Sequence, residues 1–257
     1  MKQIAPLRGT RDFYPEQKRN LNYIFNIWKK VSENFGYEDF DGPLLEPAKL
    51  WQMKSGDEMP EQMYAFKDKG DRMVAIRPEL TPTLARMIAK KTTELNKPIK
   101  WYSIPRCWRY EAPQSGRLRE FFQLNVDCLG SESMLADAEV IATAIEIMKN
   151  FNCTEKDFYI RLCNRKLIQA LLESFEIKKL QDIMRAIDKK DKLNQSEFIK
   201  ELNDLKLKTN QVKQINEMLS FDEIEKIDVK KLSKKGQEGY EELKELLKFL
   251  KEMKLEK

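Results

Sequence analysis

The stretch IKWYSIPRCWRYEAPQSGRLREFFQLNVDCL, residues 99–129, decides the fold of this chain. Polar and apolar residues alternate along its second half, and a side-chain period of two is typical of β-strands. The polar segment 111–118, which contains a glycine, separates two strand-like runs, as in a hairpin. The sequence therefore predicts two long antiparallel strands, residues 99–110 and 119–129, joined by a loop.

Strand alternation gathers chemically useful side chains on one face of this hairpin. One face of the second strand is apolar, and the other carries Arg119, Phe121, Gln123, Asn125 and Asp127. On the first strand, Cys107, Arg109 and Glu111 share a face. A register with Glu111 opposite Arg119 would place Arg109 opposite Phe121.

This set of groups suits a nucleotide bound to a sheet. Guanidinium groups bind phosphate oxygens through paired hydrogen bonds, and an aromatic ring can stack on a base. Carboxylates and glutamine amides can hold an ammonium or amino group. The alternative is a solvent-exposed sheet face, where polar residues alternating with apolar ones are ordinary.

The remaining segments predict a mixed α+β fold, because helical spacing alternates with short strand-like runs. The expected elements are a helix from Pro15 to Gly36, a hairpin of Met63–Phe66 and Met73–Ile76, a helix from an N-cap at Thr81 through Ile88, a helix from Leu135 to about Asn150, a short strand near Phe158–Leu162, and helices to the end, the last over Tyr240–Leu255. Every proline lies at or before Pro113, so the second half is expected to be helical.

Composition excludes several classes of function. The chain has no histidine, which removes histidine acid–base catalysis, Ser-His and Cys-His nucleophiles and histidine-ligated metals. Its four cysteines form no CxxC pair, so a reduced, cytoplasmic protein is expected. The net charge of +5 permits a nucleic-acid or nucleotide partner without requiring one. No apolar run is close to the length of about 18 residues that a membrane-spanning helix needs.

Several motifs resemble those of the class II aminoacyl-tRNA synthetases. Trp108–Glu111, Gly116-Arg117 and Arg119–Gln123 resemble motif 2 of that class, and Gly36–Glu46 resembles motif 1, with Pro43 as its proline. The segments that resemble the histidyl-tRNA synthetases in particular are Arg8–Pro15, Met63-Tyr64 with Arg77–Thr81, and Asp137–Val140. The match is close over about residues 5–150, and looser beyond them through Asn164–Leu167.

The resemblance implies a fold and an activity. The fold would be a class II synthetase-like antiparallel sheet flanked by helices over residues 1–165, followed by a helical insertion domain over residues 166–257. The activity would be that of a histidine–tRNA ligase, which activates histidine with ATP and transfers it to its tRNA. Mg²⁺ would bridge the ATP phosphates without a protein-built metal site, and the enzyme would be a homodimer.

The resemblance also assigns roles to individual residues. Arg109 would be the catalytic residue, because it would hold the α-phosphate and stabilise charge during the attack. ATP would contact Arg109, Glu111, Arg117 and Phe121, the amino acid would contact Glu79, Thr81, Gln123 and Asp127, and Pro43 would lie in the dimer interface. Glu111 would bind the adenine amino group, Arg117 the pyrophosphate side, and Asp127 the imidazole of the substrate.

The family's later segments do not occur in this sequence. The chain contains no Arg-Gly-Leu-Asp-Tyr-Tyr segment and no glycine-rich motif 3, and the anticodon-binding domain does not follow. We therefore expect a fragment or a split part of the enzyme that is inactive or weakly active alone. The alternative is a synthetase-like paralogue without ligase activity that acts as a regulatory or binding subunit. A plain helical binding module would leave the ordered motifs unexplained.

Overall fold

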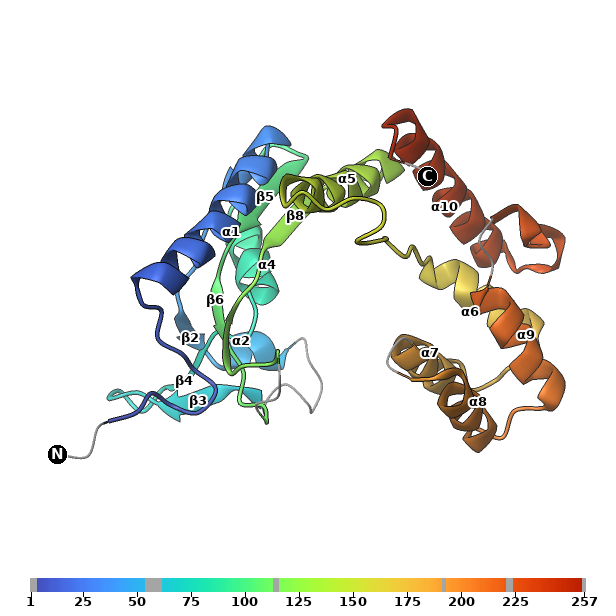
Figure 1. Ribbon diagram of the computed structural model, residues 1–257, viewed down its shortest axis with the longest axis horizontal. Coiled ribbons are helices and arrows are strands. Elements are labelled where there is room, and N and C mark those ends of the chain that lie inside the picture. The colour runs from blue at the N-terminus through green and yellow to red at the C-terminus, as the bar shows by residue number, and fades with distance from the viewer. Residues whose placement is uncertain (1–3, 54–61, 113–115, 191–192, 221–223, 256–257) are drawn as a thin grey trace. The chain divides into compact units, whose positions relative to one another are not determined.

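A computed structural model describes residues 4–53, 62–112, 116–190, 193–220 and 224–255. The chain divides into two compact units, Met1–Asp157 and Phe158–Lys257 (Figure 1). The first unit holds the strands, and the second holds helices (Figure 1). Residues 113–115 of the predicted hairpin loop lie outside the described residues.

The predicted hairpin is present, but each of its strands is interrupted. β5 (Ile99–Ser103) pairs antiparallel with β8 (Asn125–Leu129), and β6 (Arg106–Trp108) pairs with β7 (Glu120–Phe122). The same register continues across the interruption, which falls at Pro105 on the first strand. Proline has no amide hydrogen to donate to a ladder, so it ends β5 and β6 begins after it.

The predicted register of the hairpin was wrong by two residues. Phe121 lies opposite Cys107 instead of Arg109. The amide of Arg109 donates to the carbonyl of Arg119 (2.8 Å). Arg119 is therefore paired with Arg109 and not with Glu111, which makes the loop between the paired residues two residues longer than predicted. Because side chains alternate with a period of two, a shift of two residues leaves every side chain on its predicted face.

Short strands of the first unit make three further pairings. β1 (Glu38–Asp39) runs parallel to β5, on the other side of β5 from its antiparallel partner β8. β2 (Leu45–Pro47), β4 (Met73–Ile76) and β3 (Tyr64–Lys67) form an antiparallel sheet in that order, which confirms the second predicted hairpin. Its turn is held by Asp68, whose carboxylate accepts hydrogen bonds from the amides of Gly70 (2.8 Å) and Arg72 (3.0 Å).

The predicted helices of the first unit are confirmed, with one correction at a cap. α1 (Pro15–Asn34), α2 (Lys49–Gln52), α4 (Thr81–Lys90) and α5 (Met134–Asn150) are its helices among the described residues. The N-cap of α4 is Leu80 instead of Thr81, because the carbonyl of the fully buried Leu80 already accepts the first helical hydrogen bond, from Leu84 (3.0 Å). The hydroxyl of Ser133 caps α5 through the amide of Leu135 (3.2 Å).

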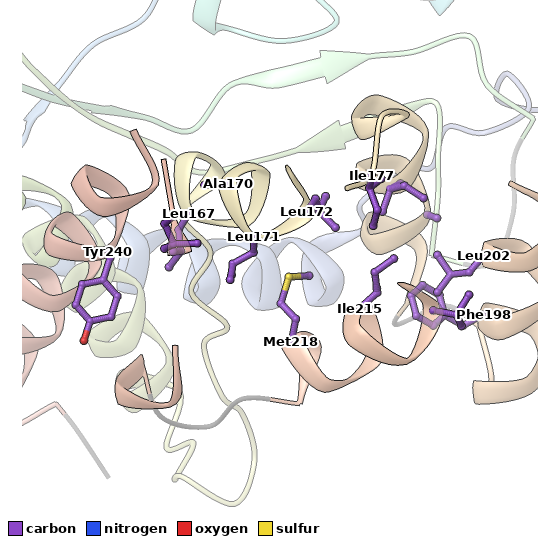
Figure 2. Close-up of a cluster of buried hydrophobic side chains, with 14 of the residues drawn as sticks. Leu167, Ala170, Leu171, Leu172, Ile177, Phe198, Leu202, Ile215, Met218 and Tyr240 are labelled. Atoms are coloured by element: carbon purple, nitrogen blue, oxygen red, sulfur yellow. The ribbon is translucent and has the colours of Figure 1, made fainter. Parts of the chain in front are cut away.

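The second unit is built from helices around one apolar core (Figure 2). They are α6 (Arg165–Ser174), α7 (Leu180–Lys189), α8 (Gln195–Asp204), α9 (Thr209–Leu219) and α10 (Lys234–Glu252), with short 3₁₀ turns η2 (Ile224–Lys226) and η3 (Val229–Lys231). Leu172, Phe198 and Ile215 are fully buried in this core. No described helix of either unit is long and apolar enough to cross a membrane.

One prediction for the second unit was wrong, and the last predicted helix needs a new starting residue. The strand expected near Phe158–Leu162 is absent from the described structure, since the segment has no paired neighbour and Tyr159 is 78% exposed. α10 begins at Lys234, ahead of the predicted Tyr240. Its early turns contain Gly239, where a Cβ atom would lie 2.8 Å from the amide nitrogen of Leu167, so glycine permits close packing of α10 on α6.

Candidate active site

Arg109 and Phe121 contact each other on one face of the interrupted hairpin. The guanidinium carbon of Arg109 lies 5.1 Å from the centroid of the Phe121 ring. The Nε atom of Arg109 donates a hydrogen bond to the carbonyl of Pro78 (3.1 Å), which ties β6 to the segment after β4. The guanidinium is therefore held in place while it stays close to an aromatic ring.

The thiol of Cys107 is fully buried, and four charged side chains influence its pKa. Burial raises the pKa of Cys107 to about 11, and the nearby charges of Arg77 and Arg109 work in the opposite direction. Glu79 and Asp41 add to the rise. The hydrogen bond from Arg109 to the carbonyl of Pro78 links Arg109 to the residue that precedes Glu79, and both are predicted site residues.

Glu111 and Arg117 form an ion pair at the loop end of the hairpin. The Nη2 atom of Arg117 donates to Oε1 of Glu111 (2.9 Å), and its Nε atom contacts Oε2. The side chain of Glu111 is only 12% exposed, whereas that of Arg117 is 61% exposed. Both carboxylate oxygens of the predicted adenine contact are thus engaged by a guanidinium from the solvent side.

Arg119 occupies its predicted strand face, but its side chain bends over the loop and packs there. Its Nε atom donates to the carbonyl of Glu111 (3.1 Å), and its guanidinium lies over the ring of Tyr110 (4.1 Å to the centroid). The amide of Arg119 donates to the carbonyl of Gly9 (2.8 Å). Gly9 has φ +85°, and a Cβ there would lie 2.7 Å from Cγ of Arg119, so this close approach requires glycine.

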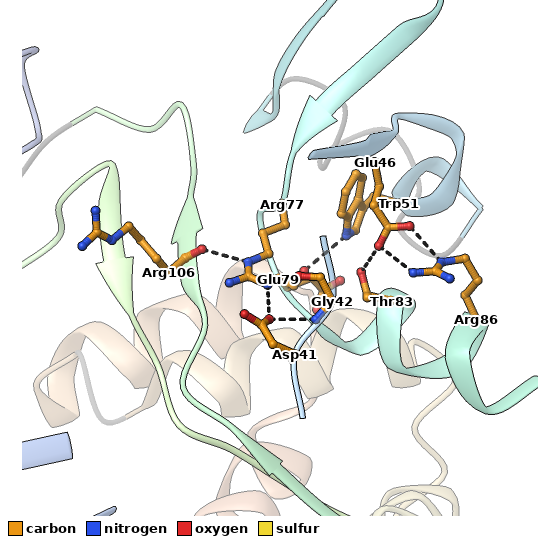
Figure 3. Close-up of polar contacts among 9 residues, drawn as sticks. All are labelled: Asp41, Gly42, Glu46, Trp51, Arg77, Glu79, Thr83, Arg86 and Arg106. Atoms are coloured by element: carbon orange, nitrogen blue, oxygen red, sulfur yellow. Dashed lines mark hydrogen bonds and ion pairs between the residues drawn. The ribbon is translucent and has the colours of Figure 1, made fainter. Parts of the chain in front are cut away.

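Arg77 is a buried residue whose contacts sequence reasoning missed (Figure 3). Its Nε atom donates to the carbonyl of Arg106 (3.0 Å), and its Nη1 atom donates to the carbonyl of Gly42 (3.0 Å) and pairs with Asp41. One guanidinium therefore joins the end of β4 to β6 and to the segment before the exposed Pro43. Its membership of the Arg77–Thr81 motif was visible in the sequence, but its burial was not.

A second buried charge, Glu46, fixes α4 to β2 (Figure 3). Its Oε1 atom accepts a hydrogen bond from Thr83 (2.8 Å), and its Oε2 atom pairs with Nε of Arg86 (2.8 Å). The indole of Trp51 donates to the backbone carbonyl of Glu79 (3.3 Å). These contacts fix both ends of the segment that carries Glu79, and the exposed Thr81 starts α4 beside it.

The predicted amino-acid contacts on the second strand differ in their hydrogen bonding. Gln123 donates through Nε2 to Oδ1 of Asn125 (2.6 Å). The buried Oδ2 atom of Asp127 has no hydrogen-bond partner among the described residues, and burial raises the pKa of this carboxyl group. An unsatisfied buried carboxylate oxygen is costly, so Asp127 is suited to a ligand that brings a hydrogen-bond donor.

The described residues contain no cluster of three or more acidic, cysteine or histidine side chains that could hold a metal ion. The acidic side chains of the site are not grouped for that purpose, since Glu111 is paired with Arg117. Mg²⁺ is commonly bound through substrate phosphates with few protein ligands.

Comparisons with known proteins agree on one family. Residues 9–257 match the family model described as histidyl-tRNA synthetase. The histidine–tRNA ligase of Leptospira biflexa is 46% identical over 196 residues, which cover 75% of this chain and 45% of that protein. The histidine–tRNA ligase of Haloarcula marismortui is 42% identical over 220 residues, covering 85% and 51%. The chain thus spans about half the length of the curated relatives it matches.

Solved structures show the same fold. The histidyl-tRNA synthetase of Nostoc sp. PCC 7120 superposes with a TM-score of 0.85 at 23% identity, covering 100% of this chain and 60% of that one. A Bacillus halodurans protein described as an ATP phosphoribosyltransferase regulatory subunit/histidyl-tRNA synthetase gives 0.81 at 22% identity, covering 99% and 66%. At these identities the likeness establishes the fold alone, and it confirms the predicted α+β architecture.

Proposed function

Because the chain belongs to the histidyl-tRNA synthetase family, we propose that it forms the part of a histidine–tRNA ligase that binds ATP and positions histidine for activation. The proposal depends most on Asp127, whose buried Oδ2 atom has no partner among the described residues. The imidazole of histidine carries an N–H donor, which would satisfy that oxygen. Asp127 lies on the same strand face as Gln123, Asn125 and Phe121.

The proposed reaction is an in-line attack at phosphorus. A carboxylate oxygen of histidine forms a bond to the α-phosphorus of ATP, the bond from that phosphorus to the bridging oxygen breaks, and pyrophosphate leaves. The hydroxyl at the 3′ end of the tRNA then attacks the activated carbonyl, which releases AMP. Positioning and charge stabilisation suffice for such chemistry, so no nucleophilic side chain is required.

Each residue of the site has a part in this proposal. Arg109, held by Pro78 and close to Phe121, would stabilise the charge that develops on the α-phosphate. Phe121 would stack on adenine, and the carboxylate of Glu111 would accept a hydrogen bond from the adenine amino group. Glu79, Thr81 and Gln123 would hold the ammonium group of histidine. Mg²⁺ would arrive as part of the nucleotide substrate, bound through its phosphates.

Membership of this family also suggests two partners for the chain, a second copy of itself and a tRNA. We place a homodimer interface at Pro43, where the neighbouring Leu44 and Leu45 are 46% and 44% exposed and apolar. Sedimentation of the purified chain checks this, since a monomer at all concentrations would contradict it. The helical residues 166–257 would contact the tRNA. A cytoplasmic location suits the four free cysteines, because reducing compartments keep thiols reduced.

ATP–pyrophosphate exchange, run with histidine and with each other amino acid, tests the activity. Exchange with histidine alone supports the ligase. A silent chain that still binds ATP supports an incomplete part of the enzyme, and restoration by a second polypeptide would identify a split enzyme. A chain that neither exchanges nor binds ATP contradicts the proposal and favours the paralogue with a regulatory or binding role.

A matched pair of arginine variants tests the role of Arg109. In the complete, active enzyme, Arg109→Ala is expected to slow adenylate formation at least about a hundredfold, by analogy with the loss of a transition-state donor. Arg106→Ala is the control, because Arg106 lies on the same strand but packs over Phe122 on the opposite face (4.8 Å to the centroid). Equal rates in the two variants would remove Arg109 from its proposed role.

A further inference from the structure

The ion pair between Glu111 and Arg117 occupies the group that the proposed function assigns to adenine. Arg117 donates to Oε1 of Glu111 (2.9 Å) and contacts its Oε2 atom, so the carboxylate offers neither oxygen freely. The Glu111 side chain is nearly buried and Arg117 is mostly exposed. A donor that reaches Glu111 from the solvent side therefore competes with the guanidinium for the same two oxygens.

We propose that Arg117 makes this site selective for adenine nucleotides that carry a phosphate chain. The guanidinium of Arg117 covers Glu111, and phosphate oxygens draw it away when such a nucleotide binds. This inference rests on the proposed ATP site. It adds a second task to Arg117, which is to disfavour adenine-bearing ligands that have no phosphates.

The selectivity follows from which contacts are exchanged. Adenosine would break a charge-assisted, two-point pair and give Glu111 one amino group in return, leaving Arg117 without its carboxylate. ATP breaks the same pair but offers Arg117 phosphate oxygens, which guanidinium groups bind in the same two-point manner. Only the ligand with both groups replaces every contact that it disrupts.

The local structure lets Arg117 move while Glu111 stays in place. The amide of Glu111 donates to the carbonyl of Arg109 (2.9 Å), and its own carbonyl accepts from Nε of Arg119 (3.1 Å). Arg117 follows Gly116, which has φ +76° and where an added Cβ would meet no described atom within 4 Å. The acceptor is thus fixed by backbone hydrogen bonds, and the guanidinium lies beside an uncrowded glycine.

A comparison of ATP binding with adenosine binding tests the proposal. Dissociation constants of ATP and adenosine are measured by calorimetry for the wild-type chain and for Arg117→Gln. We expect the variant to bind adenosine about two- to fivefold more tightly, the range for an exposed ion pair that no longer has to be broken. We expect it to bind ATP about tenfold or more weakly, because a charged hydrogen-bonding partner is lost.

A coupling measurement gives an independent readout. Inorganic pyrophosphate should tighten adenosine binding to the wild-type chain, because it holds Arg117 away from Glu111, and this coupling should disappear in Arg117→Gln. Arg72→Gln is the matched control, since Arg72 makes a similar exposed pair with Asp68 (2.7 Å) in the β3–β4 turn. The control should bind both ligands as the wild type does.

The outcomes separate this inference from the proposed function. If the wild type binds ATP but Arg117→Gln binds adenosine no more tightly and pyrophosphate has no effect, Arg117 does not cover Glu111 and the inference is wrong. If the wild type binds neither ATP nor adenosine, the ATP site itself is wrong and the inference falls with it. Urea unfolding of each variant, followed by tryptophan fluorescence, establishes that the fold is intact.

Discussion

Replacing Arg77 with methionine should destabilise the first unit strongly. Arg77 is 5% exposed and donates hydrogen bonds to the carbonyls of Arg106 and Gly42, each at 3.0 Å, besides its pair with Asp41. A hydrogen bond from a charged group contributes about 1.5–3 kcal/mol, and a buried acceptor left unpaired adds to the loss. Methionine fills the space but satisfies neither carbonyl. We expect the free energy of unfolding to fall by about 3–5 kcal/mol.

Urea titration followed by tryptophan fluorescence measures this loss in the first unit alone. All four tryptophans, residues 28, 51, 101 and 108, precede Phe158, so the signal does not report the helical unit. With a urea m-value of about 2 kcal/mol/M, the midpoint should fall by about 1.5–2.5 M. The free energy of unfolding of a unit of this kind is expected to be about 5–15 kcal/mol, so the variant should be only marginally stable.

Two controls isolate the cause. Arg72→Met removes another arginine of the same β3–β4 hairpin, but its side chain is 80% exposed, so a change within about 0.5 kcal/mol is expected. Asp41→Asn removes only the ion-pair partner, whose side chain is 63% exposed, so about 1 kcal/mol or less is expected. If Arg77→Met unfolds at the same urea concentration as Arg72→Met, Arg77 does not join the three segments.

Four further predictions concern other groups. Burial raises the pKa of Asp127, so its ionisation costs stability as the pH rises above its ordinary 3.8, and Asp127→Asn should stabilise the first unit at pH 7 more than at pH 4. Asp68→Asn should destabilise the first unit more at pH 7 than at about pH 2, since hydrogen bonds lower the pKa of Asp68 below its ordinary 3.8 and its stabilising charge is lost only as the pH falls below that value. Cys107 is buried and has a pKa of about 11, so it should resist alkylation at pH 8 until urea unfolds the chain, whereas the exposed Cys163 should react before it. Peptide mass spectrometry measures both rates, and equal rates would contradict this prediction. Phe198→Ala should destabilise the helical unit by about 3–5 kcal/mol, and an unchanged far-UV circular dichroism transition would contradict its place in the core.

The sequence predicted the elements whose pattern is local. Alternation over residues 119–129 identified the second strand and its two faces, and these faces survived even though the register was wrong by two residues. The register itself depends on where the loop closes. That position is set by the hydrogen bond between Arg109 and Arg119 and by the pair between Glu111 and Arg117, and no periodicity encodes either.

Elements that depend on distant partners were predicted less well. Residues 158–162 have the composition of a strand, but a strand forms only beside another strand, and none of those described pairs with this segment. Arg77 and Glu46 are polar in sequence and buried in the structure, because carbonyls and side chains from other segments surround them. Polarity alone cannot show such burial.

The hydrogen bonding divides the polar side chains of the candidate site into two groups. Arg77, Glu46 and Arg119 direct their bonds to other parts of the chain, so they shape the site and are unsuited to bind a ligand. Asp127 retains a buried oxygen that no described residue satisfies, and Arg117 reaches Glu111 from an exposed position. Where most polar groups of a fold have hydrogen-bond partners, a polar group that has none, or whose partner a ligand can replace, is expected at a functional site, because function there opposes stability. The stabilising effect expected of Asp127→Asn and the tighter adenosine binding expected of Arg117→Gln are therefore two tests of one principle, made at the two ends of the same hairpin.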